Sequence, residues 1–252
     1  MRIPRLYVPE ATTSGETISV TGQTAHHAVQ VLRLRPGSMI RIFNGHGPEW
    51  NALLLGCKRS EIQLEVGTPV DRLAEASLSI TLAQGIARND RMDLILQKSV
   101  ELGVSRIQPL WMQRCQAHVR GERLEKRIKH WHGVIISACE QCGRGILPEL
   151  CTPEEYSTWL TRRNNSSLGL MLQPESKHVL HNMPAPEQDV DVLVGPEGGL
   201  TTEEQRLAEA SGFQGIRLGQ RILRTETAAV VALAGIHTLW GDFLDHRNQG
   251  IP

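Results

Sequence analysis

The sequence predicts an α/β protein in which a small β-barrel precedes a mainly parallel sheet. From Leu78 onward, apolar runs of strand length alternate with segments of helical periodicity, which is typical of a parallel sheet with crossover helices. Before residue 70, short strand patterns follow one another across turn-type connections. The stretch PVDRLAEAS separates the two patterns. We therefore expect two domains, at residues 1–72 and 73–252.

The first domain is expected to contain strands at 39–44, 50–55 and 61–66, the last with clean polar and apolar alternation. NGHGPE reads as the hairpin connection between the first two strands. TAHHAVQVLRL, residues 24–34, predicts one short helix that Pro36 and Gly37 close. Together these elements fit a small barrel with one helix.

The second domain alternates strands and helices along its whole length. Strands are expected at 78–85, 104–110, 168–172, 190–194 and 215–219. Helices are expected at 89–103, 122–141, 202–211 and 225–240, and a further one from a capping box at 152–155. Because parallel strands all end at the same edge of a sheet, the turns that follow them come together there.

Composition limits the classes of function. The chain has 27 basic and 27 acidic side chains, which argues against a nonspecific polyanion binder but leaves room for a local basic face. Five cysteines, an odd number, suggest a reducing compartment. No apolar run approaches the length of a membrane helix, and the N-terminus lacks a signal-peptide pattern. We expect a cytoplasmic protein without a membrane partner.

The most informative stretch is DVLVGPEGGLTTEE, residues 191–204. It joins a buried strand to a helix that begins with a capping box, Thr201 and Glu204, through a glycine-rich turn around Glu197. The chain contains neither a phosphate-loop motif nor a dinucleotide fingerprint. Taken alone, this glycine-rich turn could be explained as a tight strand-to-helix connection. Two further strand ends, LMLQPE and LGQRILRTETAAVVAL, carry similar polar turns, and three neighbouring turns can line one pocket.

These residues resemble a known family. LVGPEGGLTTEE and LGQRILRTETAAVVAL, with QKSVELGVSRIQPL and SACEQCGR, are similar to SPOUT-class RNA methyltransferases. More closely, they resemble the methyltransferase E family, which methylates uracil N3 at a uridine of small-subunit (16S) ribosomal RNA. The likeness runs from HHAVQVLRLRPG to the final helix. It implies a PUA-like RNA-binding barrel at 1–72 and a trefoil-knotted SPOUT domain at 73–252, which forms a homodimer.

The resemblance also implies a pocket for S-adenosylmethionine, made by the three turns. Its residues would be Leu172, Gly195, Pro196, Glu197, Gly198, Gly199, Leu218, Gly219, Ile222, Leu223, Arg224, Thr225 and Ala228. Glycines let a backbone approach a ligand closely, and the leucine and isoleucine side chains suit an adenine ring.

Methyl transfer to uracil N3 requires loss of the N3 proton, so the site needs a base and a cation for the uracil anion. We assign the cation to Arg224 and the base to Glu140, which belongs to the matched ACEQCGR pattern. Ribosomal RNA would be contacted by Arg5, His27, Arg33, Arg88, Arg91 and Arg144. Two departures from the family pattern are His46, where an acidic residue is common, and Arg88 and Arg91, where lysines are expected.

Other motifs favour structural roles. Cys139 and Cys142 form a Cys-x-x-Cys pair inside a predicted helix and have no second pair, so packing is a better interpretation than metal binding. No metal site is expected. Two alternative functions stay open: a noncatalytic RNA-binding module with a degenerate cofactor pocket, and a nucleotide-dependent enzyme on a Rossmann-like sheet.

Overall fold

The computed structural model forms two compact units, which we describe separately. It describes residues 3–11, 13–58, 61–71, 75–116, 118–164, 166–187 and 189–243. The first unit comprises Met1–Glu75 and Ile136–Leu147, and the second comprises Ala76–Ile135 and Pro148–Pro252. The predicted boundary at 72/73 falls outside the described residues.

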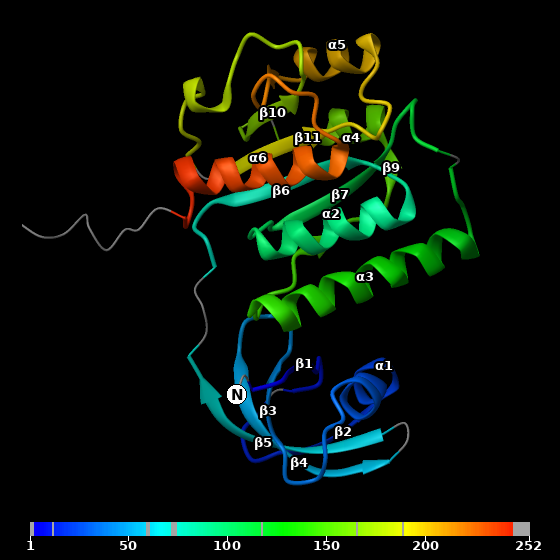
Figure 1. Cartoon of the computed structure of the whole chain (residues 1–252), viewed down its shortest axis with the longest axis vertical. Helices are drawn as coiled ribbons and strands as arrows, with labels where there is room; N and C mark the ends of the chain where they lie inside the picture. Colours follow the sequence, from blue (N-terminus) through cyan, green and yellow to red (C-terminus); the bar gives the residue numbers. More distant parts are fainter. Residues whose placement is uncertain are drawn as a thin grey trace, which may run out of the picture. The chain divides into compact units, whose positions relative to one another are not determined.

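A curled, mixed five-stranded sheet forms the first unit (Figure 1). Its strand order is β1-β3-β4-β5-β2, with β1 parallel to β3 and the other pairs antiparallel. Register shifts between β4 and β5 at Trp50 and Leu54 bend the long strands, as β-bulges do. The strands are β1 (Arg5–Tyr7), β2 (Thr17–Thr21), β3 (Met39–Phe43), β4 (Glu49–Lys58) and β5 (Glu61–Val70).

The predicted helix at 24–34 is wrong in detail. The structure has a short α-helix, α1 (Gly22–His26), followed by a π-helix, η1 (His27–Val31). The β-branched Val29 and Val31 disfavour a regular helix here. The segment ends at Arg33, which has the left-handed φ of 53°.

The later segment 136–147 joins this unit because it is bonded to it. The backbone of Leu147 donates to the carbonyl of Gly45 at 3.0 Å, and Ile146 bridges Gly45 and His46. The division predicted from the sequence contained no such return of the chain.

The second unit confirms the predicted parallel sheet. Its strand order is β12-β10-β11-β6-β7-β8, all parallel, and β9 pairs with β7. The three strands whose turns were expected to meet, β10, β11 and β12, are neighbours. The strands are β6 (Ser79–Gly85), β7 (Arg106–Trp111), β8 (Glu149–Leu150), β9 (Glu154–Glu155), β10 (Leu168–Leu172), β11 (Asp189–Val194) and β12 (Phe213–Ile216).

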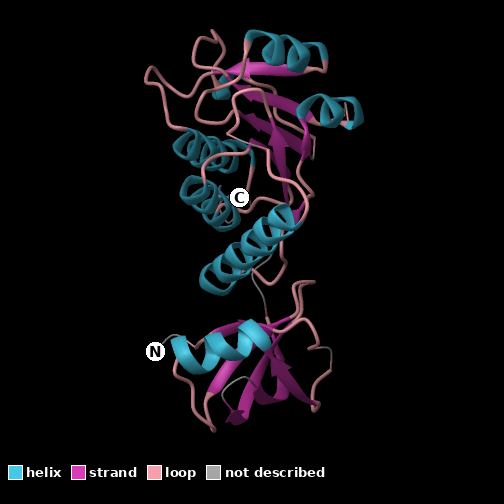
Figure 2. Ribbon diagram, turned by 90° about the vertical axis from the view of Figure 1, so that its right-hand side faces the viewer, coloured by secondary structure: helices cyan, strands magenta, loops and turns pink. Residues whose placement is uncertain are grey.

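Helices cover both faces of this sheet (Figure 2). Helices α2 (Asn89–Glu101) and α6 (Thr225–Trp240) pack side by side on one face. Helices α4 (Tyr156–Arg162) and α5 (Thr202–Ala210) lie on the other. The remaining helices are α3 (Glu122–Cys142) and the 3-10 helix η2 (Leu180–Asn182). No helix in the described ranges has the length and apolar character needed to cross a bilayer.

Two predicted element boundaries in this unit are wrong. Glu154 and Glu155 do not begin a helix but form β9 beside β7, so α4 begins only at Tyr156. Pairing with Leu110 and Trp111 at the sheet edge outweighs the local capping signal. Strand β12 ends at Ile216 rather than at Gly219, because the next backbone amide, that of Arg217, bonds to His178 outside the sheet.

Candidate cofactor site

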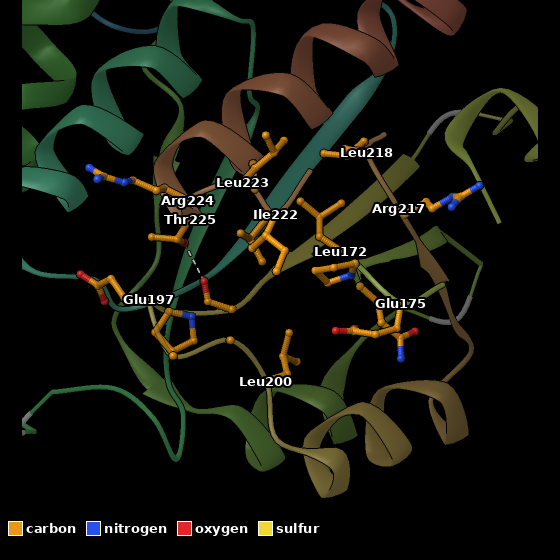
Figure 3. Close-up of a pocket in the computed structure, with 18 of the residues that line it drawn as sticks. Leu172, Glu175, Glu197, Leu200, Arg217, Leu218, Ile222, Leu223, Arg224 and Thr225 are labelled. Carbon is orange, nitrogen blue, oxygen red and sulfur yellow. Dashed lines mark hydrogen bonds between the residues drawn. The ribbon is translucent and has the colours of Figure 1, made fainter. Parts of the chain in front are cut away.

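A cavity of about 330 Å³ lies at the carboxyl ends of β10, β11 and β12 (Figure 3). All thirteen residues that the sequence assigned to a cofactor pocket line it: Leu172, Gly195, Pro196, Glu197, Gly198, Gly199, Leu218, Gly219, Ile222, Leu223, Arg224, Thr225 and Ala228. The structure therefore brings the three predicted turns to one concave site, where ligands bind in open α/β sheets.

The glycine turn requires glycine for two different reasons. Gly199 has a φ of 68°, a left-handed conformation that side chains disfavour, and its amide donates to the carbonyl of Pro196 at 2.8 Å. Gly195 has an ordinary φ, but a Cβ there would lie 3.0 Å from the backbone of Gly199 and Leu200. The turn is thus folded tightly on itself, and any side chain at Gly195 would push its two ends apart.

The capping box predicted for the next helix is confirmed. The amide of Glu204 donates to Thr201 Oγ1 at 3.2 Å, and the amide of Thr201 donates to Glu204 Oε2 at 2.7 Å. Glu204 Oε1 also accepts from the amide of Gln113 at 2.8 Å, so its carboxylate is fully used within the fold. This bonding sets the exit direction of the glycine turn.

Groups from outside the turn hold it in place. Glu197 Oε1 accepts a hydrogen bond from the amide of Arg88 at 2.9 Å and lies 3.6 Å from Arg91 Nη1. On the other side, Arg114 Nη1 donates to the carbonyls of Gly198 at 2.7 Å and Leu200 at 3.4 Å. Glu197 is therefore bonded toward the start of α2, and Arg114 is a contact that the sequence analysis missed.

A buried polar network joins the glycine turn to the start of α6. Thr225 Oγ1 donates to the carbonyl of Gly195 at 2.6 Å. It also accepts from Gln84 Nε2 at 3.0 Å, and that amide contacts the carbonyls of Gly85 at 2.8 Å and Gly195 at 3.4 Å. Gln84 is completely buried at the end of β6. The sequence offered only a glutamine inside an apolar strand as its signal.

Apolar side chains supply the walls. Figure 3 shows Leu172, Leu218 and Ile222 gathered on one side of the cavity, with Leu200 facing them. Ile222 is 83% exposed, which is unusual for so large an apolar side chain and fits a residue that covers a planar ligand. Arg224 lies at the edge of the site, ahead of α6, and Thr225 points inward.

The predicted base belongs to the first unit, whereas Arg224 belongs to the second. Glu140 Oε1 accepts from the amide of Tyr7 at 3.0 Å, and Oε2 lies 3.9 Å from His27 Nε2. Burial raises the pKa of Glu140, although the Tyr7 amide and the charges of His27 and Arg5 act in the opposite direction. A carboxylate with a raised pKa is a stronger base than an exposed one.

Two of the side chains predicted to contact RNA are instead bonded to other residues of the first unit. The buried guanidinium of Arg5 pairs with Glu49 and donates to the carbonyls of Cys139 at 2.6 Å and Arg144 at 3.2 Å. Arg5 therefore ties the end of α3 to β1 and leaves the set of RNA-facing candidates. Arg144 is largely buried and donates to Glu75 at 2.6 Å.

The remaining candidates are more accessible. Arg33 and Arg88 are exposed, and His27 and Arg91 are partly exposed. Arg33 lies two residues after the π-helix, and Arg88 and Arg91 flank the first residues of α2. The two pairs belong to different units.

The cysteine pair has the environment of packed side chains. Cys139 is buried, and burial raises the pKa of its thiol to about 12, which disfavours the thiolate that metals require. All five cysteines are free thiols. Within the described residues, no group of three or more histidine, cysteine or carboxylate side chains is arranged to hold a metal ion.

Comparison with known proteins agrees with this site. A family model described as an RNA methyltransferase domain matches residues 74–237, and one described as an RNA methyltransferase PUA domain matches residues 20–67. The ribosomal RNA small subunit methyltransferase E of Buchnera aphidicola subsp. Acyrthosiphon pisum is 31% identical over 242 residues, 96% of either chain.

Two solved structures are also similar over nearly the whole chain. One is a ribosomal RNA small subunit methyltransferase E from Neisseria gonorrhoeae bound to S-adenosyl methionine, with 38% identity and a TM-score of 0.90. The other is a putative methyltransferase from Legionella pneumophila in complex with the same cofactor, with 36% identity and a TM-score of 0.92. Each match covers 96% of this chain and 100% of the other. The chain therefore belongs to the ribosomal RNA small subunit methyltransferase E family of RNA methyltransferases.

Proposed function

We propose that this protein transfers a methyl group from S-adenosylmethionine to N3 of one uridine in small-subunit ribosomal RNA. The observation that carries the proposal is the single cavity formed by the three strand-end turns, since two similar proteins were solved with this methyl donor bound. The residues present fit the donor: glycine backbone approaches closely at Gly195, and apolar walls at Leu172, Leu218 and Ile222 suit adenine.

When bound, S-adenosylmethionine supplies an electrophilic methyl group on a sulfonium. The protein must then align the uracil ring and remove its N3 proton. Positioning of the reacting groups is worth up to about 7–11 kcal/mol of the barrier. The polar network of Gln84, Thr225 and Gly195 contributes by keeping two turns of the cavity in a fixed relation.

We assign the charge-stabilising role and the base role as follows. Arg224, exposed at the cavity edge, stabilises the negative charge that develops on the uracil as N3 loses its proton. Glu140 accepts that proton, and its raised pKa brings it closer to the pH at which a base is most effective. The target base is expected to leave its stack to reach the donor.

RNA recognition is assigned to both predicted domains. The PUA-like domain at 1–72 would hold RNA through His27 and Arg33, and the methyltransferase domain at 73–252 through Arg88 and Arg91. We further propose that the second domain is trefoil-knotted and forms a homodimer in the cytosol. Exposed apolar side chains on α2 and α6, Leu94, Val231 and Leu239, would suit such an interface, and sedimentation velocity tests it.

Two measurements test the function. Mass mapping of 16S ribosomal RNA from cells that lack the gene should show one unmethylated uridine N3, and purified protein with S-adenosylmethionine should restore it. Calorimetric titration with the donor should give a saturable heat. Donor binding without methyl transfer to ribosomal RNA would leave the noncatalytic module as the better explanation.

A further inference from the structure

The cofactor cavity has a charge imbalance that the donor does not explain. Among the described residues, five arginines but two carboxylates line it: Arg91, Arg114, Arg217, Arg221 and Arg224 against Glu175 and Glu197. S-adenosylmethionine itself carries a net positive charge at neutral pH, because its sulfonium and ammonium outweigh one carboxylate. A surplus of cations repels a ligand of net positive charge, so the surplus is better matched to a second, anionic ligand.

A second cavity of the same unit provides an internal comparison. It measures about 860 Å³ and lies at the amino ends of β6, β7 and β11. Three arginines line this cavity, and each is neutralised within the fold. Arg106 pairs with Glu149 at 2.8 Å, Arg163 pairs with Asp191 at 2.7 Å, and Arg162 pairs with Glu154. The arginines of this second cavity are thus all paired with carboxylates of the fold.

The arginines of the cofactor cavity are used differently. Arg91 lies 3.6 Å from Glu197, and Arg114 is bonded to two carbonyls of the glycine turn. In the described part of the chain, no carboxylate lies within ion-pairing distance of Arg217, Arg221 or Arg224. All three are exposed and belong to the eight-residue segment 217–224 that leads from β12 to α6.

The backbone fixes where these charges lie. Arg217 directly follows β12, and its amide is held by the carbonyl of His178 at 2.9 Å. Arg224 is the N-cap residue of α6 and directly precedes it. Figure 3 shows Arg217 and Arg224 at opposite ends of the cavity, with Ile222 between them. An anion that bound both Arg217 and Arg224 would have to extend across the mouth of the cavity, as a nucleic acid backbone can.

We propose that Arg217 and Arg221 bind phosphates of the substrate RNA beside the target nucleotide. The proposal rests on the proposed function and adds two contacts to it. Arginine presents a planar fork of donors that matches a phosphate group, and such contacts set the register of an RNA without reading its sequence. Arg217 and Arg221 would hold the backbone next to the base that enters the cavity, so they act as positioning residues.

The test compares Arg217→Gln, Arg221→Gln and the double variant with wild type. Arg162→Gln is the matched control, because it removes the same charge from the cavity at the opposite end of the strands. The substrate is small ribosomal subunits from cells that lack this methylation, and radioactive methyl incorporation gives kcat and KM. The salt dependence of KM and the calorimetric Kd for S-adenosylmethionine are measured for every variant.

We expect KM for the subunits to rise about tenfold for each lost arginine, with kcat at saturating RNA within twofold of wild type. The slope of log KM against log salt should become shallower by roughly 0.7–0.9 for each phosphate contact removed. Donor Kd and the control variant should match wild type.

Two results would overturn the proposal. A double variant with wild-type KM and salt slope would show that neither arginine meets the backbone. A donor Kd that weakens in step with KM would instead assign the arginines to the donor's carboxylate. If wild-type protein transfers no methyl group to the subunits, the proposed function fails first, and that outcome is separate from either result.

Discussion

Replacing Thr225 with valine tests the view that a buried hydroxyl holds the two main turns of the cavity together. Thr225 is 7% exposed, and valine has nearly the same size and shape without the hydroxyl, so the substitution mainly removes hydrogen bonds. The hydroxyl is lost as the donor to Gly195, a 2.6 Å bond, and as the acceptor from Gln84, a 3.0 Å bond. The carbonyl of Gly195 then keeps only the 3.4 Å contact with Gln84.

Leaving a buried polar group without its partner destabilises a protein by about 1–3 kcal/mol. We take about 2 kcal/mol for the two bonds, because Gln84 keeps its 2.8 Å bond to Gly85. For a domain of this size that corresponds to a fall in Tm of about 4–8 °C. If the whole loss of about 2 kcal/mol falls on the donor-binding conformation of the turns, that conformation becomes about thirtyfold less populated. The donor Kd then rises by up to that factor.

Thermal unfolding and calorimetric titration with S-adenosylmethionine measure the two effects on the same preparation. Thr225→Ser is the control, since it keeps the hydroxyl and loses only a methyl group. We expect the serine variant to retain most of the donor affinity and the valine variant to lose it. A Thr225→Val variant with the wild-type Tm and donor Kd would refute the reasoning, because the hydrogen bonds of Thr225 would then contribute neither to stability nor to donor binding.

Three further predictions concern other parts of the site. Glu140→Gln should lower kcat about a hundredfold or more, as expected for loss of a base. The same variant should also raise Tm near pH 8. A carboxyl whose pKa is raised by folding destabilises the folded state once the pH exceeds the pKa of that carboxyl in the unfolded chain. The gain in Tm should therefore vanish near pH 4, which unfolding measured as a function of pH would show. Gly198→Ala would place a Cβ 2.9 Å from Arg114 Cβ, and should weaken donor binding about tenfold. In an Arg114→Gly background, which removes that Cβ, the same change should cost much less, and additive losses in this double-mutant cycle would contradict the contact. Arg224→Ala should lower kcat by about 10²–10³ while donor Kd stays within twofold, and Arg224→Lys should recover part of the rate; unchanged single-turnover kinetics would remove Arg224 from the chemistry.

Two predictions, one from a local pattern and one from parallel-strand logic, were confirmed. The capping box at Thr201 and Glu204 could be read from two residues three positions apart, because both partners lie within one helical turn. Strand direction predicted that the turns after β10, β11 and β12 lie at one edge of the sheet, and the strand order makes them neighbours. The family was recognisable because the glycine turn and the segment 217–228 are long, specific motifs.

Only the tertiary structure decided which polar side chains are free to act. Arg5 and Arg221 look alike in the sequence, yet Arg5 is buried against Glu49 and two carbonyls, whereas Arg221 is exposed and has no carboxylate partner among the described residues. Gln84 acquires its role from Thr225, which lies 141 residues away along the chain. Glu154 was predicted to begin a helix but lies in a strand, because it pairs with β7. In each case the deciding partner is distant in sequence, and burial and pairing across such distances leave no periodicity in the chain.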